Sequence, residues 1–337
     1  MIDWALNLIS DYSGIIIGCI KVIIISIVLL QCVPVLVWLE RRLMGRFQVR
    51  KGPNRVGPFG LIQPIADSIK LLFKESIITS SADKFLFHLA PAIVVFTAIV
   101  SFAAIPFGEP ITIFGFTIGL WVANLDIGLL FIFAVSSMGV YGMVLGGIAS
   151  NNKYSLMGGL RSSAQMISYE LTLGLSALSI IVISGSLNLS DMVRAQETIP
   201  NIIIQPLAFL LFFIAGVAET NRAPFDLPEA EQELVAGFHT EYSGMKFAMF
   251  FMGEYINMIT MSALVTLLFL GGWNSYGLPL FPILAFSGKV FFLLCVFIWL
   301  RSTFPRIRYD RLMTFGWKVL LPLSLFNLLV TGFLKAL

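Results

Sequence analysis

The sequence contains few residues of the kind that hold metal clusters. Its 337 residues include three cysteines, Cys19, Cys32 and Cys295, and two histidines, His88 and His239. The cysteines are far apart and form no CxxC pair, whereas an iron–sulfur cluster or a structural zinc site needs about four soft ligands at suitable spacing. We therefore expect no metal centre that this chain holds alone.

Nucleotide-binding motifs and charged residues are also scarce. No GxGxxG or GxxxxGK[ST] motif follows a strand, so no nucleotide site is indicated. Only 12% of residues are charged and the net charge is +3, which argues against nucleic acid as a partner. In contrast, 58% of residues are apolar and the mean hydropathy is +0.90. One water-soluble core could not bury so much hydrophobic surface, so lipid must be the solvent for most of the chain.

Apolar segments long enough to cross a membrane recur along the chain. A helix needs about 20 mainly apolar residues to span the hydrocarbon core. Eight segments meet this standard: 14–38, 83–105, 121–149, 160–184, 202–219, 246–271, 281–301 and 315–335. The first lacks a basic start and a small-residue cleavage site, so it is interpreted as a helix rather than a signal peptide. The sequence predicts an all-α integral membrane protein whose single transmembrane domain, 1–337, has about eight spans.

The distribution of Lys and Arg predicts the orientation. The connections 38–84, 150–161, 219–246 and 301–318 hold 18 of the 22 basic residues, and the other side holds four. Cytoplasmic loops collect positive charge, so these connections are predicted to be cytoplasmic, or on the equivalent matrix side. Both termini would then lie on the periplasmic side.

The first cytoplasmic loop, 39–82, contains a segment of a different kind. From Gly60 to Phe73 apolar residues recur at helical spacing, opposite a polar stripe that includes Asp67, and Pro64 falls near the first turn. Such a helix would lie on the membrane surface, either as an anchor or as the wall of an opening for a lipid-soluble molecule. Residues 45–57 contain four basic residues, and Gly52-Pro53-Asn54 is typical of a tight turn. This segment indicates an ordered loop that docks a cytoplasmic partner or anionic headgroups.

The third cytoplasmic loop, 219–246, carries acids where positive charge is expected. Six acids accompany one arginine, Arg222, and they are Glu219, Asp226, Glu229, Glu231, Glu233 and Glu241. Asp226 is a predicted helix N-cap, which would place Glu229 and Glu233 on one face and Glu231 on another. Clustered acids away from water are suited to passing protons. The alternative is that individual acids only cap the helix or face water.

Two further acids fall inside predicted spans. Glu170 lies near the middle of the fourth span, and Glu254 lies about two turns into the sixth. A charge at such depth costs about 2.5–3.5 kcal/mol, so Glu170 needs a partner, a water-lined cavity or a proton. Glu254 is a weaker candidate because it could reach the interface.

Three classes of function fit these residues. One is a stand-alone ion transporter, another is a subunit that couples a lipophilic redox substrate to proton movement, and the third is a scaffold. Repeat-type transporters show two similar halves with paired broken helices. The sequence has no clear internal repeat, and the acidic loop has no counterpart in the N-terminal half. These observations favour the redox-coupled subunit.

Several strings resemble the H-type membrane subunit of respiratory complex I, the family that includes mitochondrial NADH dehydrogenase subunit 1. The resemblance covers essentially the whole chain and rests on Trp38-Leu-Glu40-Arg41-Arg42, Gly52-Pro-Asn-Arg55-Val-Gly57-Pro58, Leu61-Ile-Gln-Pro-Ile-Ala66-Asp67, Ala218-Glu219 through Asp226-Leu-Pro-Glu229, and Glu241-Tyr242. Related membrane proteins of membrane-bound hydrogenases and of photosynthetic complex I share this architecture and are the nearest alternatives.

The resemblance implies two sets of site residues. The first lines or supports a quinone cavity and comprises Glu40, Arg41, Asp67, Arg222, Phe225 and Asp226. The second carries charge toward the antiporter-like subunits and comprises Glu170, Glu219, Glu229, Glu231, Glu233, Glu241 and Tyr242. Within this second set, Tyr242 is expected to hold the Glu241 carboxylate by a hydrogen bond.

The resemblance also implies the setting in which the chain works. Quinone would be the substrate, while FMN and iron–sulfur clusters would be held by partner subunits. The partners would be the soluble iron–sulfur and quinone-site subunits of the peripheral arm, the small and antiporter-like subunits of the membrane arm, and membrane lipids. Such a component of a proton-translocating enzyme is inactive alone. It would lie in the bacterial inner membrane, or in the mitochondrial inner membrane if organelle-encoded.

Overall fold

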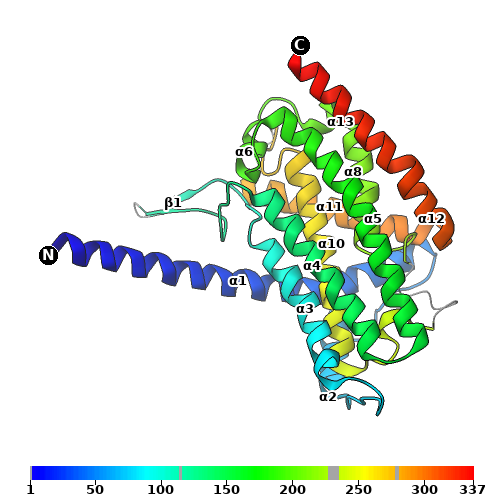
Figure 1. Cartoon of the computed structure of the whole chain (residues 1–337). Helices are drawn as coiled ribbons and strands as arrows, with labels where there is room; N and C mark the ends of the chain where they lie inside the picture. The colour runs from blue at the N-terminus through cyan, green and yellow to red at the C-terminus, as the bar shows by residue number, and fades with distance from the viewer. Residues whose placement is uncertain (1, 114–115, 227–234, 278–280) are drawn as a thin grey trace.

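The computed structural model describes residues 2–113, 116–226, 235–277 and 281–337, and this part of the chain is almost entirely helical (Figure 1). Its long helices are α1 (Ile2–Phe47), α3 (Lys84–Phe102), α4 (Gly128–Ala149), α5 (Lys153–Ser184), α8 (Pro206–Glu219), α10 (Gly244–Phe269), α11 (Pro282–Thr303) and α13 (Leu321–Ala336). Shorter helices are α2 (Gln63–Phe73), α6 (Leu189–Arg194), α7 (Asn201–Ile204) and α12 (Tyr309–Phe315). Single turns of helix lie at Pro58–Gly60, Gly237–His239 and Gly316–Leu320.

Seven helices of the described residues are long and apolar enough to cross a membrane. They confirm seven of the eight predicted spans and make the chain a multi-pass membrane protein. The segment predicted at 202–219 forms a four-residue helix followed by the 14 residues of α8. Pro206 starts α8 and lacks the N–H that would continue a helix from α7. At 1.5 Å per residue α8 is about 21 Å long, shorter than the hydrocarbon core.

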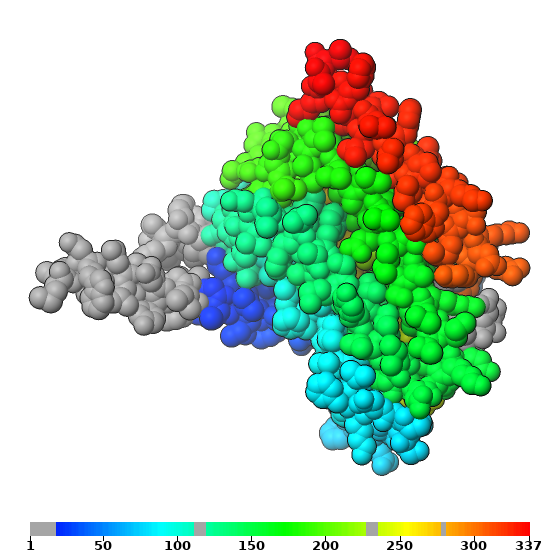
Figure 2. Space-filling view, in the orientation of Figure 1, coloured from blue at the N-terminus to red at the C-terminus, as the bar shows by residue number. Residues whose placement is uncertain are grey.

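α10 is the central helix of the bundle. Every residue from Thr260 to Phe269 is buried, and α10 packs against α1, α3, α8 and α11. α5 packs on the other side of this core, between α4, α8 and α13 (Figure 1). Figure 2 shows that the C-terminal helices α12 and α13 lie along one outer edge of the packed body.

Two glycines let three of these helices approach closely. A Cβ atom on Gly142 of α4 would come within 2.5 Å of Val94 on α3, and one on Gly253 of α10 would come within 2.4 Å of the same side chain. Both distances are shorter than carbon atoms tolerate. Small residues at such contacts are typical of membrane helices, which associate by close packing rather than by exclusion of water.

The amphipathic helix predicted in the first loop is confirmed as α2. Pro64 lies in its first turn, and the apolar side chains of Ile65, Ile69 and Leu72 are exposed. α2 packs against α1 and α10 at one end of the bundle (Figure 1). A two-stranded hairpin, β1 (Ile111–Ile113) with β2 (Phe116–Ile118), joins α3 to α4 and was not predicted.

Candidate functional site

Five charged and polar side chains meet in the interior between α1, α10, α11 and the turn after α8. Arg222 lies 3.7 Å from a Glu40 oxygen and 3.7 Å from a Glu254 oxygen. Arg301 of α11 forms an ion pair with Glu40, and the Tyr255 hydroxyl donates a hydrogen bond to Glu40 at 2.6 Å. The Arg222 guanidinium also lies over the Tyr255 ring, 4.3 Å from its centre. We call these five residues the arginine cluster.

The charges of the arginine cluster balance. Two carboxylates face two guanidinium groups, and the Arg222, Glu40 and Glu254 side chains are only 5–7% exposed. A buried ion is costly unless its partners compensate for lost water, and removal of one partner leaves an uncompensated charge. The cluster is therefore a fixed set of charges in a poorly screened environment, where a new charge nearby would be strongly felt.

A second ion pair connects α1 to α2. Arg41 donates to Asp67 at 2.6 Å, and Gln63 donates to the other Asp67 oxygen at 3.1 Å. Both charged side chains are partly exposed, so the pair is better screened than the arginine cluster. Three of the predicted cavity residues, Glu40, Arg41 and Asp67, thus lie at neighbouring positions around one end of α1.

The remaining cavity residues, Phe225 and Asp226, lie in the segment after α8. The Phe225 carbonyl accepts a hydrogen bond from Gln165 at 2.8 Å, and the same Gln165 amide donates to the Ala218 carbonyl at 2.9 Å. The Asp226 carbonyl accepts from Arg306. The buried Gln165 of α5 therefore holds both ends of the turn that carries Arg222, which fixes the position of that guanidinium.

Two predicted relay acids, Glu170 and Glu219, line one small internal cavity. Its volume is about 20 Å³, and its polar wall is completed by Ser136, Asn257 and Thr260. Glu219 is 7% exposed, and its buried Oε2 atom has no hydrogen-bond partner among the residues that the structure describes. A space of this size holds about one water molecule when polar partners are available. The cavity thus places two acids and hydrogen-bonding side chains around a single water-sized space.

Glu241 and Tyr242 do not form the hydrogen bond predicted between them. Glu241 accepts from Asn152 at 2.7 Å and from Thr79 at 3.5 Å. The Tyr242 hydroxyl instead donates to the Gly146 carbonyl at 3.5 Å, and its ring stacks on Phe87. Burial raises the pKa of the Tyr242 hydroxyl, so it stays protonated. Adjacent residues point to different partners here because Tyr242 packs into the core while Glu241 joins two neighbouring loops.

This geometry predicts that Glu241 positions the loops through its hydrogen bonds. Glu241→Gln keeps an oxygen that can accept from Asn152, so in the complex that the sequence resemblance implies we expect quinone reductase activity to stay within about threefold of wild type. Glu241→Ala removes both hydrogen bonds, and at about 1 kcal/mol each the assembled fraction at raised temperature should fall. Activity assays combined with native gels after heating separate these outcomes. If the glutamine variant lost proton pumping with normal assembly, Glu241 would instead be a proton carrier.

The acids Glu229, Glu231 and Glu233, and the helix predicted to carry them, lie outside the described residues. Their relay role stays a prediction. The structure otherwise brings the predicted residues into separate groups: Glu40 with Arg222, Arg41 with Asp67, and Glu170 with Glu219.

Sequence reasoning missed three residues of the site and undervalued a fourth. Tyr255, Arg301 and Gln165 were not candidates, and Glu254 was only tentative, yet Glu254, Tyr255 and Arg301 complete the arginine cluster. Two signals were present: Glu254 is an acid inside an apolar segment and adjoins Tyr255, and Arg301 lies in the last turn of an apolar helix. Which acid pairs with which arginine depends on helix packing, which no local pattern encodes.

Comparisons with known proteins agree on one family. A family model described as NADH dehydrogenase matches residues 20–332. The chain is 56% identical to an H-type NADH-quinone oxidoreductase subunit of Geobacter metallireducens, over 94% of this chain and 96% of that protein. It is 52% identical to the protein of the same kind from Syntrophobacter fumaroxidans, over 98% of each chain. One from Geobacter sulfurreducens is 57% identical over 93% of this chain and 94% of its own length.

Proposed function

Because this chain belongs to the family of H-type NADH-quinone oxidoreductase subunits, in the membrane arm of respiratory complex I, we propose that it forms the membrane part of the quinone tunnel and an acidic relay that couples quinone reduction to proton translocation. The family makes the chain a multi-pass component of a translocase complex whose other subunits are its partners. Quinone is the substrate of that complex.

The arginine cluster is the observation that carries the proposal for the quinone side. Glu40, Arg222 and Glu254 are buried, and Arg301 supplies the second positive charge that balances the two carboxylates. Arg41 with Asp67 continues the polar surface toward α2. Quinone reduction adds electrons and demands protons at the headgroup. Fixed buried charges respond strongly to such a change because water screens them poorly. A tunnel that leads the headgroup past this cluster would therefore convert its redox state into a change in electrostatic potential.

The relay side is supported by the cavity between Glu170 and Glu219. Two acids that share a water-sized space can exchange a proton through one water molecule without crossing apolar surface. Acids inside a membrane protein often mark proton pathways. In the proposed mechanism, a change in charge at the arginine cluster moves protons along Glu219 and Glu170, with Glu229, Glu231 and Glu233 supplying the cytoplasmic part of the relay. The shift then passes laterally to antiporter-like subunits.

We infer the partner subunits from the family and the orientation in the membrane from the distribution of Lys and Arg. The peripheral arm, with its FMN and iron–sulfur clusters, would deliver electrons to quinone at the cytoplasmic loops. Small membrane subunits would contact the relay, and both termini would face the periplasm of a bacterial inner membrane. The similar proteins from Geobacter and Syntrophobacter are named as NADH-quinone oxidoreductase subunits, which favours the respiratory branch over the hydrogenase and photosynthetic relatives.

A photoreactive quinone added to the assembled complex tests the tunnel directly. The proposal expects labelled peptides within residues 40–75 and 219–245, with labelling suppressed by excess unmodified quinone. Labelling confined to other subunits would exclude this chain from the tunnel. The isolated chain holds no electron carrier in the proposal, so NADH oxidation by it alone would also contradict the assignment.

Asp67→Asn gives a graded test of the tunnel entrance. The substitution removes the charge that pairs with Arg41 but keeps the side-chain shape. Because partly exposed ion pairs contribute about 0.2–1 kcal/mol, the KM for quinone should rise by no more than about fivefold while kcat changes little. Steady-state assays over a range of quinone concentrations measure both constants. An Asp83→Asn variant, altered at a helix cap away from this pair, is the control.

A further inference from the structure

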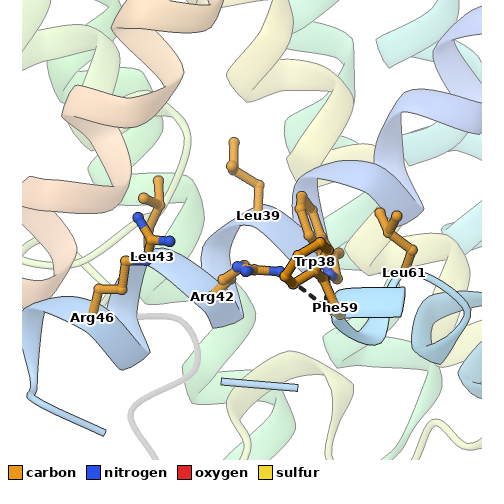
Figure 3. Close-up of a pocket in the computed structure, with 7 residues that line it drawn as sticks. All are labelled: Trp38, Leu39, Arg42, Leu43, Arg46, Phe59 and Leu61. Carbon is orange, nitrogen blue, oxygen red and sulfur yellow. Dashed lines mark hydrogen bonds between the residues drawn. The ribbon is translucent and has the colours of Figure 1, made fainter. Parts of the chain in front are cut away.

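A second cavity lies on another face of α1, outside the arginine cluster. It has a volume of about 310 Å³ and is lined by Trp38, Leu39, Arg42, Leu43, Arg46, Phe59 and Leu61 (Figure 3). This volume is at the lower end of the range for small-molecule sites. It lies at the end of α1 that the distribution of Lys and Arg predicts to be cytoplasmic. None of the residues that line it has a role in the proposed quinone cavity or relay.

Three consecutive charged residues of α1 point to three different places. Glu40 faces the arginine cluster, Arg41 pairs with Asp67 on α2, and Arg42 lines the cavity. Successive residues of a helix are turned by about 100°, whereas residues four apart share a face. Arg46 therefore lies one turn from Arg42 on the cavity side. The first two charges have ion-pair partners, and the two cavity arginines form no ion pair among the described residues.

The floor of the cavity is held in place by hydrogen bonds. Trp38 and Arg42 both donate to the Phe59 carbonyl, at 3.0 and 3.1 Å, and both side chains turn toward Phe59 (Figure 3). The Arg42 guanidinium lies over the Phe59 ring at 4.7 Å and over the Trp38 ring at 5.3 Å. Phe59 itself has a φ of 58°, a left-handed conformation that is costly for a side chain of its size. These contacts fix the orientation of Arg42 before any ligand arrives.

The cavity combines positive charge with apolar walls. None of its seven lining residues is acidic, while Leu39, Leu43 and Leu61 provide the apolar surface. Beyond Leu61 the exposed apolar stripe of α2 continues through Ile65 and Ile69. A neutral headgroup such as a quinone would leave both guanidinium groups without an opposite charge. An anion with an attached hydrocarbon chain would pair with the two arginines and also pack against the apolar walls.

We propose that this cavity binds the phosphate of an anionic phospholipid from the cytoplasmic leaflet. Arg42 and Arg46 would hold the phosphate, as guanidinium groups do with two parallel hydrogen bonds, and an acyl chain would lie along Leu61, Ile65 and Ile69. The lipid would brace the turn at Pro58–Gly60 against α1 and so fix the start of α2. This assignment does not depend on the proposed tunnel or relay.

The test uses the assembled complex in nanodiscs that contain a diazirine-bearing phosphatidylglycerol. After illumination, mass spectrometry should find labelled peptides that contain Trp38–Arg46 or Phe59–Leu61. Unlabelled phosphatidylglycerol should suppress this labelling, whereas phosphatidylcholine and inorganic phosphate should not. The double variant Arg42→Gln/Arg46→Gln should lower labelling by about tenfold or more, since each arginine near an anionic lipid contributes about fivefold.

The double variant Arg50→Gln/Arg55→Gln is the matched control. It removes the same charge from exposed positions of the following loop, outside the cavity, and should leave labelling unchanged. An equal loss in both double variants would show a diffuse surface charge effect and overturn the site. Loss of labelling when inorganic phosphate is added would assign the cavity to a free anion. Loss of labelling when quinone is added would assign it to the tunnel. Equal labelling by a phosphatidylcholine probe would exclude a preference for anionic lipid. The wild-type competition remains decisive if the cavity variant fails to assemble.

Discussion

Complexes that carry Arg222→Met are expected to lose almost all quinone reductase activity. Arg222 lies 3.7 Å from both Glu40 and Glu254, and methionine would remove a positively charged partner from each of these two buried carboxylates. Removing one partner of a buried ion pair costs about 3–5 kcal/mol. If this free energy destabilises only the active arrangement of the site, activity should drop by about two orders of magnitude or more. If it destabilises the folded chain, the assembled fraction should drop instead. NADH:quinone reductase assays on membranes, with native gels for assembly, measure both.

Charge balance provides the sharpest control for this prediction. In Arg222→Met/Glu254→Gln one positive and one negative charge are removed together, which leaves Glu40 paired with Arg301. We expect this double variant to assemble better than Arg222→Met alone because the positive and negative charges of the arginine cluster stay equal in number. Arg308→Met removes an arginine whose ion pair with Asp310 is 80% exposed, and it should behave like wild type. Equal damage in the single and double variants would mean that Arg222 acts through its shape rather than its charge.

The fold could be predicted from sequence wherever one local property decides it. Seven spans followed from the length of apolar runs, and α2 followed from its helical spacing with Pro64 in the first turn. The segment at 202–219 was harder because its composition is apolar throughout, while the break depends on Pro206. The hairpin between α3 and α4 escaped prediction because two three-residue strands carry too short a pattern to stand out.

The site was less accessible to sequence reasoning, for a physical reason. Glu170 could be selected because a charge inside a predicted span is costly, and Glu219 because it belongs to an acidic loop where positive charge is expected. Their pairing could not be, because it requires α5 and α8 to pack with both side chains toward one cavity. Similarly, Glu254 looked capable of reaching the interface, yet α10 is the central helix and places it at 5% exposure beside Arg222. Depth along a helix can be read from sequence, but the direction of a side chain within the bundle cannot.

The cavity between Glu170 and Glu219 leads to the second large prediction. Glu170→Gln/Glu219→Gln keeps the size and hydrogen bonding of both side chains but removes both groups that can release a proton. If protons pass this point, proton pumping by the assembled complex should fall below about a tenth of the wild-type rate, since general acid–base groups typically contribute far more than tenfold. Pumping is measured with a pH-sensitive dye in proteoliposomes, and NADH oxidation by a soluble acceptor should be unchanged. Glu197→Gln, at an exposed position outside the relay, serves as the matched control.

Asn257→Leu separates the two acids from the space they share. The leucine would occupy part of a cavity of about 20 Å³ and remove an amide from its wall, while both carboxyl groups remain. A relay that works through one water molecule should then lose pumping nearly as severely as the double glutamine variant, because neither acid could reach the other across apolar surface. If Asn257→Leu pumped normally while the glutamine variant did not, protons would leave Glu219 by another path. Normal pumping in both variants would remove Glu170 and Glu219 from the mechanism.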